Sequence, residues 1–328
     1  MRRLLLLAAM LAAVGPASAE EPKTLKLEQT IPLTGKPGRF DHLALDAKGK
    51  RLFVANLSND SLDIVDLKAG KVVKQLTGQK KAQGVAFAPA LNRIYQGNGT
   101  DGVCNVFDGS TFKLLHSLKL PDADNVRFDA TSGLVYVGHA EAMLTAFDAK
   151  TYAVKYEIKL PGAPESFQID AGRKRMYVNC LKPGTVAVID LEKHEVIAKY
   201  PLTKADANYP LALDIEGKRV FVGCRKPAKV VILDADTGKE VSNADIPADI
   251  DDLFYDAKRK RLYASCGEGT LAVLQDKGSG KFKIVENIPT RKLARTCLFD
   301  AGTDRLFVIL PRTDDKTPPE LRIYRSQD

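Results

Sequence analysis

The chain contains 328 residues, of which 45% are hydrophobic and 27% are charged, so it has enough apolar material for a large packed core. Its 49 lysines and arginines exceed its 41 aspartates and glutamates, which gives a formal net charge of +8, but the basic residues are spread along the chain. This distribution lacks the clustered charge of a nucleic-acid-binding face, so a nucleic-acid ligand stays open but unsupported. The five cysteines form no C-x-x-C or C-x-x-C-H motif, so c-type haem attachment and thioredoxin-like redox chemistry are both unsupported.

The first element in chain order is an apolar N-terminal segment. A basic region at Arg2 and Arg3 precedes an apolar run over residues 4–14, and a small-x-small cleavage pattern ends at Ala19. The run is too short to span a bilayer, so we expect no transmembrane anchor. The segment predicts a signal peptide over residues 1–19, cleaved after Ala19, and therefore a periplasmic or secreted protein.

A repeat follows this segment and continues to the end of the chain. Equivalent apolar residues, which serve here as anchors, recur every 41–44 residues. The anchors are Leu52, Ile94, Val135, Met176, Val220, Leu262 and Leu306. A fixed period of this length indicates a repeat architecture, and no linker interrupts it, so residues 20–328 are expected to form a single domain.

Each repeat contains short apolar runs that turn residues separate. In the first repeat they read HLALD, RLFVAN, SLDIVD and KVVKQL. The inner runs are apolar almost throughout, as strands are when both faces are buried. Four-stranded antiparallel blades packed around an axis produce this pattern, so the sequence predicts an all-β fold, a seven-bladed β-propeller.

The two ends of the chain complement each other. The last repeat stops after LRIYRSQD, its third strand, and lacks a fourth. The segment TLKLEQTIPL at residues 24–33 precedes the first repeat and has no other place in it. We expect this segment to form the outer strand of the last blade, which closes the ring and removes an exposed sheet edge.

Two stretches of the repeat carry a resemblance to a known family. FVANLSNDSLDIVDLKAGKVVKQL and YVNCLKPGTVAVIDLEKHEVIAKYPL resemble the YVTN repeat, in which Tyr-Val-x-Asn precedes a Val-x-Val-Ile-Asp strand. The third and seventh repeats, GLVYVGHA and RLFVILPR, depart from this motif. Over essentially the whole mature chain the sequence resembles secreted, YncE-like propellers of the WD40/YVTN-like superfamily. The resemblance implies the propeller fold, a periplasmic or surface location and binding roles of mixed kind, with single-stranded DNA binding in one branch. It implies no catalytic residue.

Comparison among the repeats separates structural positions from variable ones. An Asp six positions before the anchor and an Arg one position before it each recur in six of the seven repeats, and both flank a turn. The positions eleven and ten before the anchor vary and are strongly polar. Because they precede the innermost strands, we expect them to surround one mouth of the central channel. The candidates among them are Asp41, His42, Asp124, Asn125, Glu165, Tyr209, Asp251, Asp252 and Arg295.

A uniform antiparallel register would place a second series of residues opposite this ring. His139 would then lie beside Asp124, and Cys266 beside Asp251. Asp124 with His139 would form either an oriented general base or a simple hydrogen-bonded surface pair, so His139 joins the binding candidates. Cys180, Cys224 and Cys266 take matching positions on consecutive blades about 10 Å apart, too far for disulfides, so we expect unlinked thiols.

The mouth candidates are rich in carboxylates. Ca²⁺ takes six to eight oxygen ligands, and carboxylates, amides and water supply them. The candidate metal ligands are Asp124, Asn125, Glu165, Asp251 and Asp252, with Arg295 as the one expected counter-charge. Two interpretations stay open, a Ca²⁺ site and a solvated mouth without a metal.

The sequence favours an exported, non-catalytic binding or scaffold protein. We expect a monomer whose polar mouth binds a protein, peptide or polymer. The alternative is a divalent-metal-dependent, lactonase-like hydrolase with its site at the mouth, which rests on analogy between folds alone. An electron-transfer or quinoprotein-type subunit is disfavoured by the missing haem motif and by the content of only four histidines.

Overall fold

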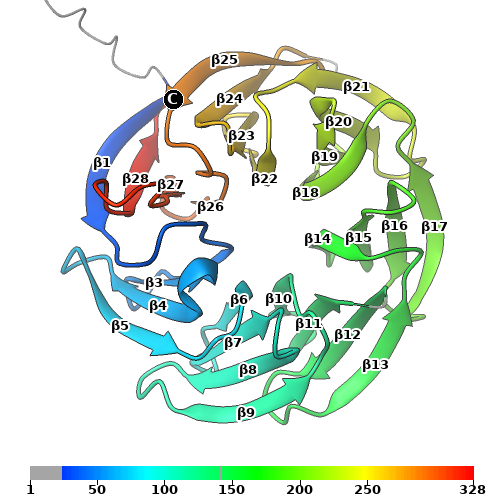
Figure 1. Cartoon of the computed structure of the whole chain (residues 1–328). Helices are drawn as coiled ribbons and strands as arrows, with labels where there is room; N and C mark the ends of the chain where they lie inside the picture. The colour runs from blue at the N-terminus through cyan, green and yellow to red at the C-terminus, as the bar shows by residue number, and fades with distance from the viewer. Residues whose placement is uncertain (1–23, 141, 279) are drawn as a thin grey trace, which may run out of the picture.

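The computed structural model describes residues 24–140, 142–278 and 280–328, so the expected signal peptide lies outside the described residues. The strands form seven four-stranded antiparallel sheets, arranged as blades in a ring around a central channel (Figure 1). This arrangement confirms the all-β, seven-bladed prediction. In each blade the first strand lines the channel and the fourth lies at the rim.

The first four blades follow one another along the chain. Blade 1 contains β2 (Leu43–Asp46), β3 (Arg51–Asn56), β4 (Ser61–Asp66) and β5 (Lys71–Thr77). Blade 2 contains β6 (Ala82–Ala88), β7 (Arg93–Asn98), β8 (Val103–Asp108) and β9 (Leu114–Lys119). Blade 3 contains β10 (Val126–Asp129), β11 (Leu134–His139), β12 (Met143–Asp148) and β13 (Val154–Lys159). Blade 4 contains β14 (Pro164–Asp170), β15 (Arg175–Cys180), β16 (Thr185–Asp190) and β17 (Glu195–Pro201).

The remaining blades complete the ring. Blade 5 contains β18 (Asp206–Asp214), β19 (Arg219–Lys226), β20 (Ala228–Asp234) and β21 (Glu240–Asp245). Blade 6 contains β22 (Ile250–Asp256), β23 (Arg261–Cys266), β24 (Thr270–Asp276) and β25 (Phe282–Pro289). Blade 7 contains β26 (Cys297–Asp300), β27 (Arg305–Leu310) and β28 (Glu320–Ser326). A short 3-10 helix, η1 (Leu57–Asn59), follows β3 on the face of the ring seen in Figure 1.

The fourth strand of blade 7 is β1 (Leu25–Pro32), which comes from the other end of the chain. It pairs antiparallel with β28, from Leu25 opposite Ser326 to Pro32 opposite Glu320. The expected ring closure is therefore confirmed. Because β1 supplies the outer strand, β28 has no open edge that could pair with another chain.

The recurrent Asp and Arg residues are parts of turns, as their recurrence predicts. Asp46 accepts a hydrogen bond from the Gly49 N–H at 2.8 Å and forms an ion pair with Arg51 at 2.6 Å. At the end of a third strand, Asp234 accepts from the Thr237 N–H at 2.8 Å. These side chains satisfy backbone donors that the strands leave unpaired, which explains their presence in most blades.

The core lies between the blades rather than within one of them. In one cluster, Leu52 and Val54 of blade 1 pack with Phe307 and Ile323 of blade 7, and all four side chains are buried. Each blade therefore buries apolar residues on both of its faces. This packing is the physical reason for the unbroken apolar runs in the inner strands.

Candidate binding site at the channel mouth

A β-bulge at the start of the inner strands shapes the channel mouth. In blades 2, 4, 5 and 6 the pairing between the first two strands skips a residue at the variable polar positions. In blade 3, the Asp124 N–H donates to the Gly138 carbonyl and the Gly138 N–H donates to the Asn125 carbonyl, both at 3.0 Å. Two residues therefore oppose one, and such a bulge re-aims the side chains of the bulged strand.

The bulge corrects the uniform register that the sequence suggests. Cys266 pairs with Ile250, not with Asp251, and Asp124 pairs with Gly138, not with His139. The expected Asp124–His139 pair is therefore wrong, because the extra residue in the inner strand shifts its pairing with the second strand by one position at the mouth end. The His139 Nε2 lies 2.8 Å from Thr145 Oγ1, and His139 does not line the mouth.

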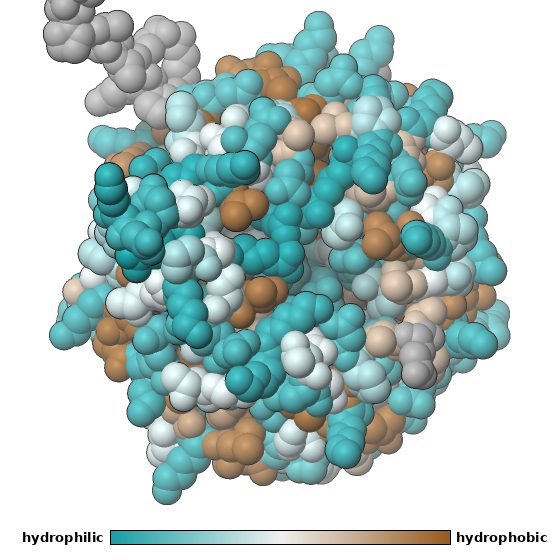
Figure 2. All heavy atoms as spheres, in the orientation of Figure 1, coloured by the Kyte–Doolittle hydropathy of each residue, from teal (hydrophilic) through white to brown (hydrophobic). Residues whose placement is uncertain are grey.

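The mouth encloses a pocket of about 430 Å³, called the mouth pocket below. Figure 2 shows the central hollow of this face, and hydrophilic residues surround it. Seven of the sequence candidates line the pocket, from six of the blades: Asp41, His42, Asp124, Glu165, Tyr209, Asp251 and Arg295. The other lining residues are Arg39, Leu57, Lys81, Gln83, Asp122 and Arg225. Asn125, His139 and Asp252 are the candidates that do not line it.

Arginines neutralise two of the mouth carboxylates. Arg39 Nη2 lies 2.8 Å from Asp41 Oδ2, and Arg225 Nη2 lies 2.5 Å from Asp251 Oδ1. Arg295 Nε approaches the second oxygen of Asp251 at 2.9 Å. The expectation that Arg295 alone offsets the carboxylates is therefore wrong. The mouth carries charges of both signs.

Arg225 is also held against an aromatic ring. Its guanidinium carbon lies 3.6 Å from the centre of the Tyr209 ring, and its Nε donates to the Ile250 carbonyl at 2.8 Å. A guanidinium that stacks and forms ion pairs at the same time is fixed in position. Tyr209 and Arg225 therefore form a rigid wall of the mouth pocket.

Asp124 and Glu165 differ from the other carboxyl groups of the mouth. Among the described residues, neither carboxyl group has a hydrogen-bond or ion-pair partner. Burial and the charge of Asp41 raise the pKa of Asp124 to about 7. Burial and the charge of Asp124 raise the pKa of Glu165 to about 8. Both groups are thus poised to exchange a proton near neutral pH.

A buried ionic pair closes the pocket from below. His42 Nδ1 lies 3.3 Å from Asp252 Oδ1, and His42 Nε2 lies 3.6 Å from Asp41 Oδ1. Burial disfavours the imidazolium, but the carboxylates of Asp252 and Asp41 outweigh it and raise the pKa of His42 to about 10. The second oxygen of Asp252 accepts a hydrogen bond from the Cys297 N–H at 2.9 Å. His42 is therefore a cation that ties blade 1 to blade 6.

Below His42 the channel continues as a second space of about 280 Å³. Arg127, Gln168 and Asp252 line it together with apolar residues of the inner strands. Asn125 is buried, and its Oδ1 accepts a hydrogen bond from Arg127 Nη2 at 3.1 Å. Asn125 and Asp252 thus serve contacts below the mouth.

The mouth residues do not fit a Ca²⁺ site. Asp251 is engaged by two arginines, and Asn125 and Asp252 lie outside the mouth pocket. Across the described part of the chain, no group of three or more His, Cys, Asp or Glu side chains is placed to hold a metal ion. The five oxygen ligands that the sequence suggests therefore do not converge.

All five cysteines are free and buried. Burial raises the pKa of Cys180 to about 11 and that of Cys224 to about 12. A thiol with a raised pKa is rarely the reactive thiolate. These cysteines therefore pack as small apolar residues.

The sequence did not predict three arginines of the channel, namely Arg39, Arg127 and Arg225. The comparison among repeats contains a signal for two of them. At the position eight residues before the anchor, Arg127 is the one charged residue among the seven repeats. At the position five residues after the anchor, the one charged residue is Arg225. Arg39 precedes the first inner strand and has no such signal.

Comparison with known proteins supports the fold. No protein-family model matches the chain. The chain is 29% identical over 184 residues to a protein of Salmonella typhimurium named "Uncharacterized protein YncE", and 28% identical to the Salmonella typhi protein of the same name. Each match covers 53% of this chain, and the chain spans about half (51%) of the length of these relatives.

A solved structure extends the likeness to most of the chain. Hydrazine synthase of Kuenenia stuttgartiensis superposes with a TM-score of 0.73 at 16% identity, over 84% of this chain and 93% of that one. At this identity the likeness concerns the fold alone. Among the described residues, no helix is long and apolar enough to cross a membrane. The ring of seven blades shows a β-propeller, and over about half of its length the chain is similar in sequence to the two proteins named YncE.

Proposed function

We propose that this protein is an exported, non-catalytic binding protein that captures its ligand in the mouth pocket. The composition of the first 19 residues supports export to the periplasm or the medium. The rigid ring supports a binding role, since it presents side chains from all seven blades at one concave site. The YVTN-type repeat, suggested by the sequence, is compatible with this role.

One observation carries the proposal. Asp41 and Asp251 are neutralised within the protein, whereas the carboxyl groups of Asp124 and Glu165 line the pocket without a partner among the described residues. A ligand that brings hydrogen-bond donors and positive charge supplies the missing partner. We therefore assign the pocket to a ligand with protonated amines, such as a lysine-containing peptide.

The lactonase-like alternative receives less support. Its metal would need several carboxylates free to converge on one point, and Asp251 is already held by Arg225 and Arg295. A turnover of lactones or esters that Asp124→Asn abolishes would contradict the binding proposal and favour the hydrolase.

Isothermal titration with tri-lysine as the probe tests the proposal. We expect saturable binding that is tighter at pH 8.5 than at pH 6.0, because the pKa values of about 7 and about 8 require Asp124 and Glu165 to lose protons first. Tri-lysine acetylated on its side chains should not bind. Glu165→Gln should weaken binding at pH 8.5 and reduce its pH dependence, whereas Glu195→Gln on the outer strand β17 should change nothing. Equal binding of the acetylated peptide, or no binding at either pH, would overturn the assignment.

A further inference from the structure

A second cavity lies at the junction between blade 7 and blade 1. It has a volume of about 810 Å³, and we call it the junction groove. Its walls include the turns between first and second strands, at Ala47 and Thr303, and the turn between β4 and β5, at Lys68. The inner strands start at the mouth, so these turns lie on the opposite face of the ring. The junction groove is therefore separate from the mouth pocket.

Most other blade junctions are tied at this level by a specific hydrogen bond. At five of them an Arg or Tyr of the second strand donates to a residue near the end of the third strand of the next blade. The pairs are Arg51 to Gly109, Tyr95 to Ala149, Tyr177 to Ala235, Arg219 to Asp276 and Arg261 to Gln327. Between blades 3 and 4 the ring centres of Tyr156 and His194 lie 3.6 Å apart, and the two rings line a smaller equivalent groove of about 300 Å³.

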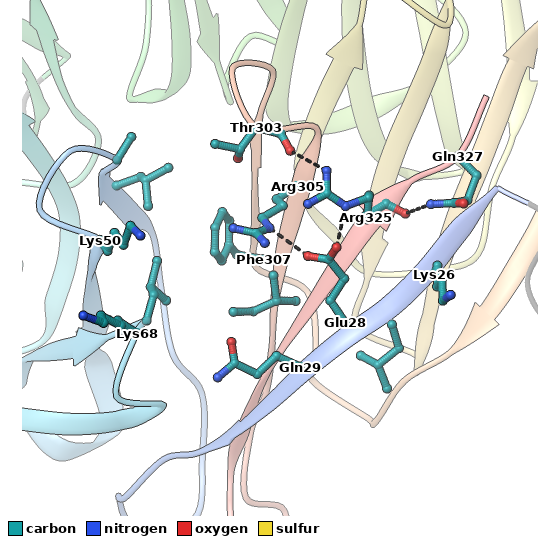
Figure 3. Close-up of a pocket in the computed structure, with 15 residues that line it drawn as sticks. Lys26, Glu28, Gln29, Lys50, Lys68, Thr303, Arg305, Phe307, Arg325 and Gln327 are labelled. Atoms are coloured by element: carbon teal, nitrogen blue, oxygen red, sulfur yellow. Dashed lines mark hydrogen bonds and ion pairs between the residues drawn. The ribbon is translucent and has the colours of Figure 1, made fainter.

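The junction of blade 7 with blade 1 lacks such a tie among the described residues. Arg305 Nε donates to Glu28 Oε2 at 2.8 Å, and Arg325 donates to the other oxygen of Glu28, so both arginines turn to their own blade (Figure 3). In blade 5 the residue two positions after the third-strand Asp is Asp236, which accepts from Arg173 and Arg175 of blade 4. The matching residue of blade 1 is Lys68. Lys68 therefore places a cation at the position where the junction between blades 4 and 5 has the carboxylate of Asp236.

The junction groove is consequently rich in positive charge. Lys50 and Lys68 lie on the blade 1 side, and Lys26, Arg305 and Arg325 lie on the blade 7 side (Figure 3). Among the described residues that line the groove, Glu28 is the one carboxylate. The negative charge of Glu28 is shared between Arg305 and Arg325. The positive charges of the lysines are therefore not balanced by a carboxylate of the groove, and they attract anions.

Apolar side chains lie between these charges. Leu27 is 46% exposed, Leu45 and Leu67 are partly exposed, and Phe307 and Ile323 form the buried base. A contiguous apolar patch that polar residues surround is typical of an interaction site. The groove volume lies in the range of roughly 300–1,000 Å³ that holds drug-sized ligands, so it suits a short segment rather than a folded domain.

From the missing inter-blade tie, the unmatched cations and the apolar base, we infer that the junction groove binds a short acidic peptide segment of a partner protein that carries large apolar side chains. Cations distributed over both walls match several separate carboxylates, whereas a lipid headgroup would place its charge at one point. A nucleic acid would need an exposed aromatic ring on which bases stack. Phe307, the aromatic residue that lines the groove, is only 2% exposed.

Fluorescence anisotropy tests this inference. The probe is a fluorescein-labelled hexapeptide that alternates glutamate and leucine, titrated with the full-length protein at 50 mM and 300 mM NaCl. We expect saturable binding that weakens at the higher salt concentration because the exposed charges are screened. A glutamate–serine hexapeptide, which lacks the apolar side chains, should bind at least several-fold more weakly.

Two substitutions locate the site. Lys68→Asp should weaken binding about tenfold, since it replaces an attraction by a repulsion, and should leave the melting temperature undiminished. Lys159→Asp makes the same charge change on the exposed strand β13, far from the groove, and should bind like the wild type. The junction groove and the mouth pocket have no lining residue in common, so failure of the mouth-pocket proposal leaves this inference intact. Equal binding by Lys68→Asp, equal binding of the glutamate–serine peptide, or tighter binding of a labelled oligothymidylate would overturn it.

Discussion

Replacement of Asp252 by asparagine probes the ionic pair beneath the mouth pocket. Asp252→Asn keeps an oxygen that can accept from the Cys297 N–H but removes the charge 3.3 Å from His42. A pKa of about 10 for His42, against an ordinary value of 6.5, corresponds to about 5 kcal/mol of stabilisation of the imidazolium. The carboxylate of Asp41 remains at 3.6 Å and retains part of this stabilisation. We therefore expect a loss of about 3 kcal/mol in the free energy of unfolding at pH 6, in line with other buried pairs that lose one partner.

The contribution of His42 to the free energy of unfolding depends on pH. Because the pKa of His42 is raised in the folded protein, its contribution is complete below pH 6.5 and is lost as the pH rises through about 10. Without the charge of Asp252 the pKa of His42 falls, so the variant loses less stability than the wild type as the pH rises. The difference in stability between the two proteins should therefore shrink from pH 6 to pH 9.5.

Urea denaturation followed by circular dichroism at pH 6 and pH 9.5 measures both effects. Asp245→Asn is the matched control, because Asp245 pairs with Lys229 at the rim and its side chain is 86% exposed. This control should shift the free energy of unfolding by less than about 1 kcal/mol. Equal stability of Asp252→Asn and the wild type at pH 6, or a difference that does not change by pH 9.5, would refute the assignment of a buried imidazolium.

Three further predictions concern closure, packing and export. A protein that starts at Gly35 lacks β1 and should melt at a lower temperature or self-associate through β28; unchanged melting and monomeric elution would contradict the closure role. Gly84→Ala should lower the melting temperature, because a Cβ there would lie 1.8 Å from the Asp124 carbonyl oxygen, whereas Gly172→Ala, where the nearest atom would lie 3.6 Å away, serves as a control for packing. The protein purified from the periplasmic fraction should begin at Glu20 in N-terminal sequencing, and a sequence that begins at Met1 would exclude cleavage after Ala19.

Much of the mouth could be read from the sequence because the repeats serve as an internal alignment. Positions that recur, such as Asp46 and Arg51, are turn residues in the structure, and positions that vary, such as Asp124 and Glu165, line the mouth pocket. The same comparison, extended to other positions, would have identified Arg127 and Arg225. The uniform register expected from the sequence is wrong, because a bulge inserts one residue into the inner strand. No particular residue type marks the position of this bulge in the sequence.

The number of blades and the closure by β1 were determined by the sequence alone. Each repeat contains the apolar runs that bury both faces of a blade, and the strand-like segment at residues 24–33, which precedes the first repeat, pairs with the last blade as expected. The tertiary structure alone decided which charges meet. His42 and Asp252 belong to blades that are not consecutive, and they meet at the channel, where the inner strands of blades 1 and 6 are each bulged at these residues. Coulomb energies depend on such distances, and neither the local pattern nor the repeat period of a sequence contains them.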